Sequence, residues 1–364
     1  MKAALISFGS VSSKWIGEAM KKYFAHVDEL DIRQIEVNLT QKGAKVLHAG
    51  NPIGNYDCVY AKGSYRYSPL LRSLATELYP LTYMPVKPPA FTLGQDKLLT
   101  QLKLQQCKIP MPVTYLAATT ESAKEILRKI NYPIIIKFPS GMQGKGVMFA
   151  ESYAAASSLL DALTTLRQPF LIQEYIETEG VDTRAIVVGD TVVAAMKRKA
   201  MTGEKRANIH AGGEGIATEL DQQTKAIAIR AAEAIGAEIC GVDIIEGDKG
   251  PLVLEVNLSP GLQGITNTTK IDVADKIAQY LYQRSKQWRA GPAQGSNKIF
   301  QELGVESSSA AAMQEIITTL DMKANRLVIP QIVTQLCGIS ANEEVTITVR
   351  KGELHIKKFS VGKK

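Results

Sequence analysis

The most constraining feature of the sequence is a pair of apolar segments, ICGVDII and PLVLEVN, that carry isolated oxygen-bearing side chains. They flank the polar stretch EGDKG, so they predict an antiparallel hairpin with its turn centred near Lys249. Asp243 and Glu255 each lie six positions from that centre. They should therefore be cross-strand neighbours, with Cβ atoms about 5 Å apart. Asn257 shares the face of Glu255, because side chains two apart in a strand point the same way.

This cluster predicts a metal site. Two carboxylates at such a separation repel one another unless a cation lies between them or one of them takes up a proton. A ligand set made only of oxygen atoms favours Mg²⁺ or Mn²⁺ over zinc. We therefore predict that Asp243, Glu255 and Asn257 bind metal. The alternative is a solvent-facing strand pair that carries ordinary polar residues.

Composition places the chain among soluble globular proteins. Its 364 residues are 45% hydrophobic and 22% charged, which suits two or three domains. The four cysteines are far apart and form no CxxC pair, which argues against a disulfide framework or a zinc site and fits a reducing cytoplasm. The N-terminal apolar stretch is too short for a signal peptide, and no apolar run is long enough for a membrane span. We therefore predict a cytoplasmic protein.

The order of expected elements predicts an α/β chain. A strand, a loop and a helix open the sequence, and residues 56–63 form a second apolar strand that should pair in parallel. Gly9 after the first strand is read as an ordinary turn. A proline-rich stretch, residues 79–91, marks a domain boundary. Further along, a hairpin should turn at Gly189-Asp190, and a helix should end at Gly236.

A glycine-rich turn, KFPSGMQGKG, is a second candidate site. Lys137 ends the apolar run Ile134–Ile136, where a lysine is costly to bury without an anion. Gly144 and Gly146 would let backbone N–H groups approach a phosphate. The turn lacks the spacing of a P-loop and lies between two strands, so a plain flexible hairpin is the alternative.

Two polar segments indicate a functional site only when they are considered together with the metal cluster and the glycine-rich turn. QEYIETEGVDTR ends a predicted strand, and KRANIHAGGEG would place Arg206, Asn208 and His210 on one face if it is extended. Arginine suits phosphoryl oxygens. A polar loop is the alternative for each segment.

The order of these motifs resembles the ATP-grasp superfamily, and most of all its RimK-type carboxylate–amine ligases. The motifs are DK at 96–97, IIIKFPSGMQGKGV, LIQEYIE, RANIHAGGEG, GVDII and LEVNLSPGLQGI. The resemblance implies a pre-ATP-grasp α/β domain at 1–90, matched in architecture only. It further implies a two-lobed α+β ATP-grasp domain at 91–286, followed by a linker at 287–321.

The resemblance also implies roles for individual residues. The phosphates of ATP would be held by Lys97 and Lys137, with the glycine-rich turn beside them, and Asp182 would lie near the ribose. Adenine would meet the backbone of the strand end formed by Gln173, Glu174 and Tyr175. Arg206 and Asn208 would face the triphosphate and the developing acyl phosphate as catalytic groups. One or two Mg²⁺ ions, or Mn²⁺, would occupy the metal site, and His210 would either assist proton transfer or be structural.

The implied activity is that of an ATP-dependent acid–amino-acid ligase. It would join the amino group of glutamate or a similar amino acid to an acceptor carboxylate on a peptide, a protein tail or a cofactor. The reaction would pass through an acyl phosphate and release ADP. One alternative is a ligase that acts on an amino-group carrier protein in lysine or arginine biosynthesis. Another is a DNA-binding regulator with a degenerate ATP-grasp sensor. The presence of all the expected metal-binding and phosphate-binding residues argues against this alternative.

Residues 322–364 resemble the AbrB/SpoVT swapped-hairpin fold. They carry eight Lys or Arg against three Glu, which is +5 of the chain's net charge of +7. Such a short β-rich unit needs a partner to complete a core. We therefore predict that it makes the protein a homo-oligomer, a dimer or a tetramer. Oligomerisation or substrate docking is favoured over DNA binding, because lysines at strand ends also protect sheet edges.

Overall fold

The computed structural model describes residues 1–41, 43–139, 146–199 and 214–290, together with four short strands between residues 321 and 358. The chain divides into two compact units, Met1–Arg289 and Ala290–Lys364. Within the described ranges, none of the helices has the length and hydrophobicity that a bilayer crossing requires.

The first part of unit 1 is a parallel sheet with the order β2-β1-β6. Its elements are β1 (Lys2–Ser7), α1 (Val11–Lys21), β2 (His26–Asp31) and β6 (Cys58–Ala61). This confirms the predicted strand, loop and helix and the parallel pairing of the two apolar strands. A small antiparallel sheet that was not predicted follows β2, and two helices lead on from β6. These elements are η1 (Ile32–Gln34), β3 (Ile35–Thr40), β4 (Gly43–His48), β5 (Asn51–Pro52), η2 (Tyr65–Tyr67) and α2 (Ser68–Leu78).

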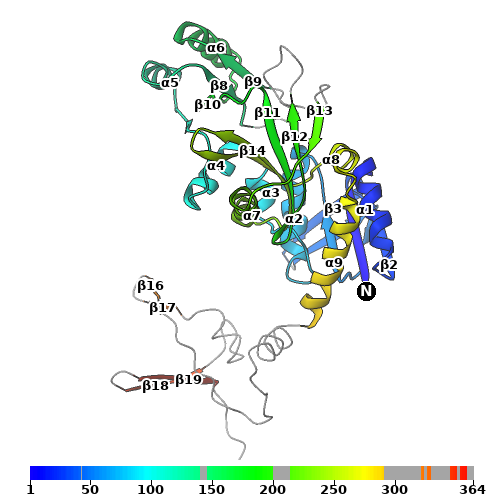
Figure 1. Cartoon of the computed structure of the whole chain (residues 1–364). Coiled ribbons are helices and arrows are strands. Elements are labelled where there is room, and N and C mark those ends of the chain that lie inside the picture. The colour runs from blue at the N-terminus through cyan, green and yellow to red at the C-terminus, as the bar shows by residue number, and fades with distance from the viewer. Residues whose placement is uncertain are drawn as a thin grey trace, which may run out of the picture. The chain divides into compact units, whose positions relative to one another are not determined.

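A second part of unit 1 is a four-stranded antiparallel sheet with the order β7-β10-β8-β9. Two short helices, α3 (Ala90–Leu93) and α4 (Lys97–Gln106), precede it. Its elements are β7 (Thr114–Tyr115), α5 (Thr120–Leu127), β8 (Ile134–Lys137), β9 (Val147–Ala150), α6 (Tyr153–Thr165) and β10 (Leu171–Glu174). Leu127 of α5, Ile136 of β8 and Leu160 of α6 share one core cluster. Figure 1 shows this sheet and its helices at one end of unit 1.

The third part is a five-stranded antiparallel sheet with the order β13-β12-β11-β14-β15. Its elements are β11 (Val181–Val188), β12 (Thr191–Lys199), β13 (Glu214–Ala217), α7 (Gln222–Ile235), β14 (Ile239–Gly247), β15 (Gly250–Asn257), α8 (Gln263–Thr269) and α9 (Val273–Ala290). Side chains of α7 share one core cluster with this sheet, and side chains of α8 and α9 share a second one. The hairpin turn at Gly189 and the left-handed Gly236 that ends α7, with φ of 86°, confirm two predictions.

The hairpin β14–β15 contains a one-residue bulge. Ile244 pairs with Val253, but Asp243 pairs with Glu255, so Leu254 is the extra residue. An uninterrupted ladder would put Leu254 opposite Asp243 and would turn Glu255 to the other face. The predicted cross-strand pair of Asp243 and Glu255 is confirmed, and the bulge is what produces it.

Unit 2 is described only as two short antiparallel pairs. They are β16 (Asp321–Lys323) with β17 (Arg326–Val328), and β18 (Val345–Arg350) with β19 (Glu353–Lys358). The described part of this unit consists of strands, in agreement with the predicted β-rich character. The last helix of unit 1 runs to Ala290, past the domain boundary predicted at residue 286, and residues 291–320 of the predicted linker lie outside the described residues. The resemblance to the swapped-hairpin fold stays a prediction.

Candidate active site

A cavity of about 330 Å³ in unit 1 lies where α4, the β7-β10-β8-β9 sheet and the β11–β15 sheet meet. Its lining includes every described residue of the predicted site except Gly146. These residues are Lys97, Lys137, Gln173, Glu174, Tyr175, Asp182, Asp243, Glu255 and Asn257. Gly144, Arg206, Asn208 and His210 lie outside the described residues. Segments as far apart as residues 97 and 257 therefore converge on one cavity.

Lys137 ends β8 and faces this cavity. Its Nζ donates to Oε1 of Gln173 at 2.5 Å, and Nε2 of Gln173 donates to Oγ1 of Thr114 at 2.8 Å. Burial lowers the pKa of Lys137 to about 8, while the charge of Glu255 opposes that fall. An ammonium that lines the cavity, and whose side-chain hydrogen bond goes to a neutral amide, leaves its charge available to an anion there.

The strand end predicted for adenine has few free backbone groups. Gln173 lies in ladders with both β7 and β8, and the N–H of Glu174 donates to the carbonyl of Val113. Tyr175 follows the end of β10, and its ring packs edge-on against Phe149 with centroids 5.0 Å apart. A base that meets this strand end would therefore lie against Tyr175.

Gly146 occupies a position where its backbone conformation and its close neighbours leave no room for a side chain. Its φ is 80°, and a Cβ there would lie 2.3 Å from the ring of Phe138. The N–H of Phe138 also donates to the carbonyl of Gly146. Close backbone approach requires glycine here, and the contact it makes is with Phe138.

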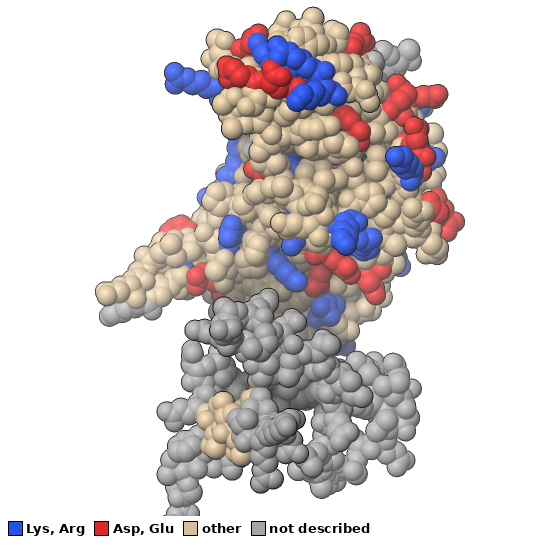
Figure 2. Space-filling model, turned by 90° about the vertical axis from the view of Figure 1, so that its left-hand side faces the viewer, with Lys and Arg blue, Asp and Glu red and all other residues tan. Residues whose placement is uncertain are grey.

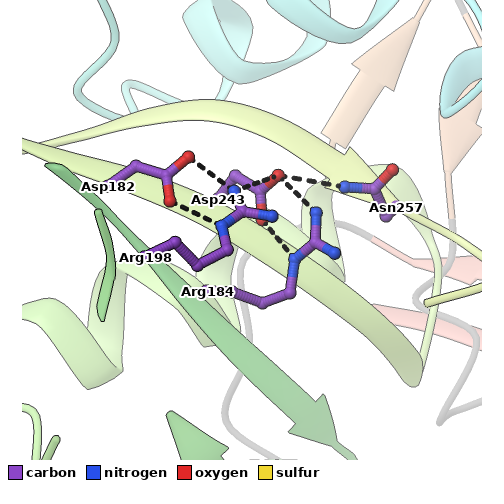
Figure 3. A network of polar contacts seen from close by, with 5 residues as sticks. All are labelled: Asp182, Arg184, Arg198, Asp243 and Asn257. Atoms are coloured by element: carbon purple, nitrogen blue, oxygen red, sulfur yellow. Dashed lines mark hydrogen bonds and ion pairs between the residues drawn. The ribbon is translucent and has the colours of Figure 1, made fainter. Parts of the chain in front are cut away.

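Four charged side chains that line the cavity form an ion-pair network, which Figure 3 shows together with Asn257. Arg184 donates to both oxygens of Asp243, Nε to Oδ1 at 2.8 Å and Nη2 to Oδ2 at 2.7 Å. Arg198 holds Asp182 through two bonds of 2.6 and 2.5 Å, and its Nη2 also lies 3.1 Å from Oδ2 of Asp243. Burial would raise the pKa of Asp243, but the two guanidiniums hold it well below its usual range. Burial raises the pKa of Asp182 to about 6 despite the contact with Arg198.

Comparison with known proteins decides the family. The sequence model of the RimK-like ATP-grasp domain matches residues 94–281. This chain belongs to the RimK-like ATP-grasp family. A protein of Legionella pneumophila (strain Corby) named probable alpha-L-glutamate ligase is 37% identical over 258 residues, which are 69% of this chain and 84% of that protein. One of the same name from Xanthomonas euvesicatoria pv. vesicatoria (strain 85-10) is 35% identical over 288 residues, 78% of this chain and 98% of that protein.

Solved structures agree in fold. The ATP-grasp ligase PsnB, complexed with a minimal precursor, Mg and ADP, has a TM-score of 0.62 at 18% identity and covers 78% of this chain and 98% of its own. A RimK domain protein from Sphaerobacter thermophilus has a TM-score of 0.59 at 19% identity, with 77% and 99% covered. The predicted α/β fold class and the family resemblance are confirmed, and this RimK-like chain is an ATP-dependent ligase.

Sequence reasoning assigned no role to Arg184 and Arg198, which both line the cavity. Arg184 was visible as the residue two positions after Asp182, on the same strand face. Arg198 carried no signal of its own, because it belongs to the basic run KRK and its partner lies sixteen positions away.

The oxygen cluster fits a divalent metal in part. Both oxygens of Asp243 are taken by guanidiniums, and Nδ2 of Asn257 lies 3.3 Å from Oδ2. The amide oxygen of Asn257 is then the atom left for a ligand, together with the carboxylate of Glu255, which has no ion pair with any described residue. The described parts of the chain contain no group of three His, Cys, Asp or Glu placed to hold a metal. Glu255 and Asn257 thus keep oxygen atoms for a metal, and the predicted role of Asp243 as a third ligand stays a prediction.

Gln101 of α4 supports the bulge that positions Glu255. Its Nε2 donates to the carbonyl of Leu254, the extra residue of β15, at 3.2 Å. Gln101 is only 5% exposed, and it lines the cavity together with Leu254. Sequence reasoning missed this contact as well, since Gln101 and Leu254 are 153 positions apart.

A smaller cavity of about 50 Å³ adjoins the main one. The two share Lys97, Leu254, Glu255, Asn257 and Ser259. The smaller cavity adds Gly63 and Ser64, which follow β6 of the first sheet. The loop after β6 thus borders the predicted metal ligands.

Proposed function

We propose that this chain joins the amino group of glutamate, or of a similar amino acid, to an acceptor carboxylate with release of ADP. The observation that carries the proposal is the convergence of two lysines and the Glu255–Asn257 pair on one cavity. The names of the relatives from Legionella and Xanthomonas support glutamate as the amino acid.

The proposed reaction has two balanced steps. An oxygen of the acceptor carboxylate attacks the γ-phosphorus of ATP, the bond to the β–γ bridging oxygen breaks, and ADP leaves. The amine then attacks the acyl carbon, inorganic phosphate leaves, and one amine proton passes to solvent or to a nearby base. No nucleophilic side chain is needed.

The task of the chain is to bring two anions together. Lys97 at the start of α4 and Lys137 at the end of β8 line the cavity where the phosphates would lie. Burial of Lys137 strengthens its attraction for developing charge, because water screens it poorly there. Mg²⁺, held by Glu255 and Asn257, would neutralise further phosphate charge when it is bound. The ring of Tyr175 would meet the base, and the glycine-rich turn with Arg206 and Asn208 completes the proposed site.

A peptide or protein tail is the proposed acceptor. The solved relative PsnB was captured with its precursor peptide, which supports this class over a cofactor. The smaller cavity brings Gly63 and Ser64 next to Glu255 and Asn257, and we propose that the acceptor carboxylate lies on this side of the site. The DNA-binding alternative gains no support from the face of unit 1 in Figure 2, where basic and acidic side chains are interspersed. We propose a cytoplasmic homo-oligomer with the domain boundaries expected from the sequence.

The test supplies the full chain with ATP, Mg²⁺, radiolabelled glutamate and a peptide-containing cell extract. We expect label to enter acid-stable, protease-sensitive material in step with ADP release. The matched control is Glu255→Gln, which preserves shape and removes the proposed ligand charge. Failure of label to enter any acceptor, with glutamate or with other amino acids, would refute the proposal.

A further inference from the structure

Lys137 lies on a sheet face where its direct neighbours are apolar. It pairs with Leu171 of β10 on one side and with Val147 of β9 on the other. Ile135, two positions earlier in β8, shares its face. All four side chains line the main cavity. The three apolar side chains have no atom that accepts a hydrogen bond, so the position of the ammonium is set by another residue.

The side chain of Gln173 reaches this ammonium along a diagonal of the sheet. Gln173 lies two positions after Leu171, the residue directly opposite Lys137. Diagonal neighbours of this kind are within reach of long side chains. Nζ of Lys137 donates to Oε1 of Gln173 at 2.5 Å, and Lys137 forms no ion pair with the part of the chain that the structure describes. Gln173 is only 4% exposed, so water competes little for this contact.

A second hydrogen bond fixes which end of the amide faces Lys137. Thr114 of β7 lies directly opposite Gln173, and its Oγ1 accepts from Nε2 at 2.8 Å. The hydroxyl of Thr114 then donates to the carbonyl of Pro112 at 3.0 Å. An ammonium only donates and a proline carbonyl only accepts, so the three bonds have one consistent direction. This chain of bonds runs from β8 across β10 to β7 and ends on the backbone.

We propose that the side chain of Gln173 is a positioning group for Lys137, and that Thr114 holds Gln173 in place. The inference rests on the proposed function, in which Lys137 binds a phosphate of ATP. Glutamine has the reach of glutamate, but its amide carries no charge. Gln173 therefore orients the ammonium and leaves its charge to the phosphates, whereas a carboxylate in the same place would pair with it. The backbone of Gln173 lies in the ladders with β7 and β8, so this task falls to its side chain.

The experiment measures by calorimetry how full-length variants bind a non-hydrolysable ATP analogue in the presence of Mg²⁺. We expect Gln173→Glu to weaken binding at least about tenfold, because its carboxylate takes the charge of Lys137. Gln173→Met should weaken binding about three- to tenfold, because the ammonium loses its acceptor. The matched control is Gln168→Glu, at an exposed position before β10, which should change the dissociation constant less than about twofold. Unchanged binding in either Gln173 variant would overturn the proposal.

A double-mutant cycle separates positioning from a merely structural role. Lys137→Met alone should weaken analogue binding at least about tenfold. When residue 137 is already methionine, Gln173→Met should add less than about a twofold loss, because no ammonium is left to orient. Equal losses from Gln173→Met in both backgrounds would show that the residue does not act through Lys137. Binding that Lys137→Met leaves unchanged would also overturn the proposal.

Thr114 supplies a test that does not depend on whether the Gln173 variants fold. Thr114→Val keeps the shape of the side chain and removes the hydroxyl, so it should weaken analogue binding about threefold. Thr114→Ser keeps the hydroxyl and should restore most of the affinity that Thr114→Val loses. Equal binding by Thr114→Val and the unchanged protein would refute the role of Thr114.

Binding without turnover keeps this inference apart from the proposed function. Ligation is followed separately, through radiolabelled glutamate and ADP release. A protein that binds the analogue in a Gln173-dependent way but ligates no amino acid would overturn the proposed function alone. Ligation by a protein whose affinity for the analogue does not depend on Gln173 would overturn this inference alone.

Discussion

Replacing Lys62 by methionine should stabilise the protein. Burial lowers the pKa of Lys62 from its usual 10.5 to about 8, with no opposing charge. That fall corresponds to roughly 3 kcal/mol of unfavourable free energy for holding the ammonium in the folded chain at neutral pH. Methionine has nearly the same length and keeps the buried methylenes. We therefore expect Lys62→Met to raise the free energy of unfolding by about 2–3 kcal/mol at pH 7.

The gain should depend on pH in a defined direction. Below pH 8 the lysine is charged in both the folded and the unfolded chain, so the full penalty is present. As the pH rises from about 8 toward 10.5, the folded chain releases the proton while the unfolded chain still holds it. The stability of the unchanged protein then rises with pH, and its difference from Lys62→Met shrinks.

Urea unfolding followed by tryptophan fluorescence measures this gain. Both tryptophans, Trp15 and Trp288, lie in unit 1, so the signal reports the unit that holds Lys62. Lys45→Met on an exposed strand position should change stability by less than about 0.5 kcal/mol. A loss of stability in Lys62→Met at pH 7 would show that an attractive partner holds the ammonium, and would refute the reasoning.

Four further predictions concern the site and the tail. Glu255→Gln should abolish ADP release with little change in the urea midpoint, whereas Asp243→Asn should cost several kcal/mol of stability because it leaves Arg184 without its carboxylate partner and Arg198 with Asp182 alone; equal midpoints would contradict this division. Lys137→Met should weaken ATP binding measured by calorimetry at pH 7, and the affinity of the unchanged protein should fall above pH 8 while that of Lys137→Arg does not; binding that Lys137→Met leaves unchanged would refute the role. Gln101→Leu should weaken Mg²⁺-dependent turnover more than ATP binding, because the carbonyl of Leu254 loses its donor and Glu255 its support; Gln105→Leu, at an exposed position of the same helix, is the control. A chain that ends at residue 290 should show a smaller oligomer by light scattering than the full chain, and equal oligomer sizes would mean that the tail does not set assembly.

The elements found from the sequence are those whose burial pattern is strong. Strands such as β8 and β14 are apolar over most of their length, and α7 ends at a glycine in the left-handed region. The strands β2 to β5 escaped notice because they bury little. Leu39 of β3 is 74% exposed, and β2 carries three acidic residues. Without a buried face, alternation gives no signal.

The contacts of Arg198 with Asp182 and Asp243 were not predicted for a different reason, which is the register of the strands. In the hairpin β11–β12, Val188 pairs with Thr191 and Val187 with Val192, but Ile186 pairs with Ala194. Val193 is therefore an extra residue, and it shifts the partner of Asp182 from Lys197 to Arg198. A ladder without the bulge would turn Arg198 to the other face of the sheet.

A one-residue bulge also occurs in the neighbouring hairpin β14–β15, where Leu254 is the extra residue that brings Glu255 opposite Asp243. Two bulges thus set which charged side chains share the cavity lining, one on each side of the β11–β14 pair. Counting six residues to either side of Lys249 predicted the pairing of Asp243 with Glu255. The turn itself is centred half a residue before Lys249, because Gly247 pairs with Gly250. The extra residue Leu254 shifts the centre of the later pairs to Lys249, and only for that reason was the prediction correct. Spacing can place oxygens on one strand, but the contact of Asp243 with Arg198, Arg184 and Glu255 depends on these two single-residue insertions.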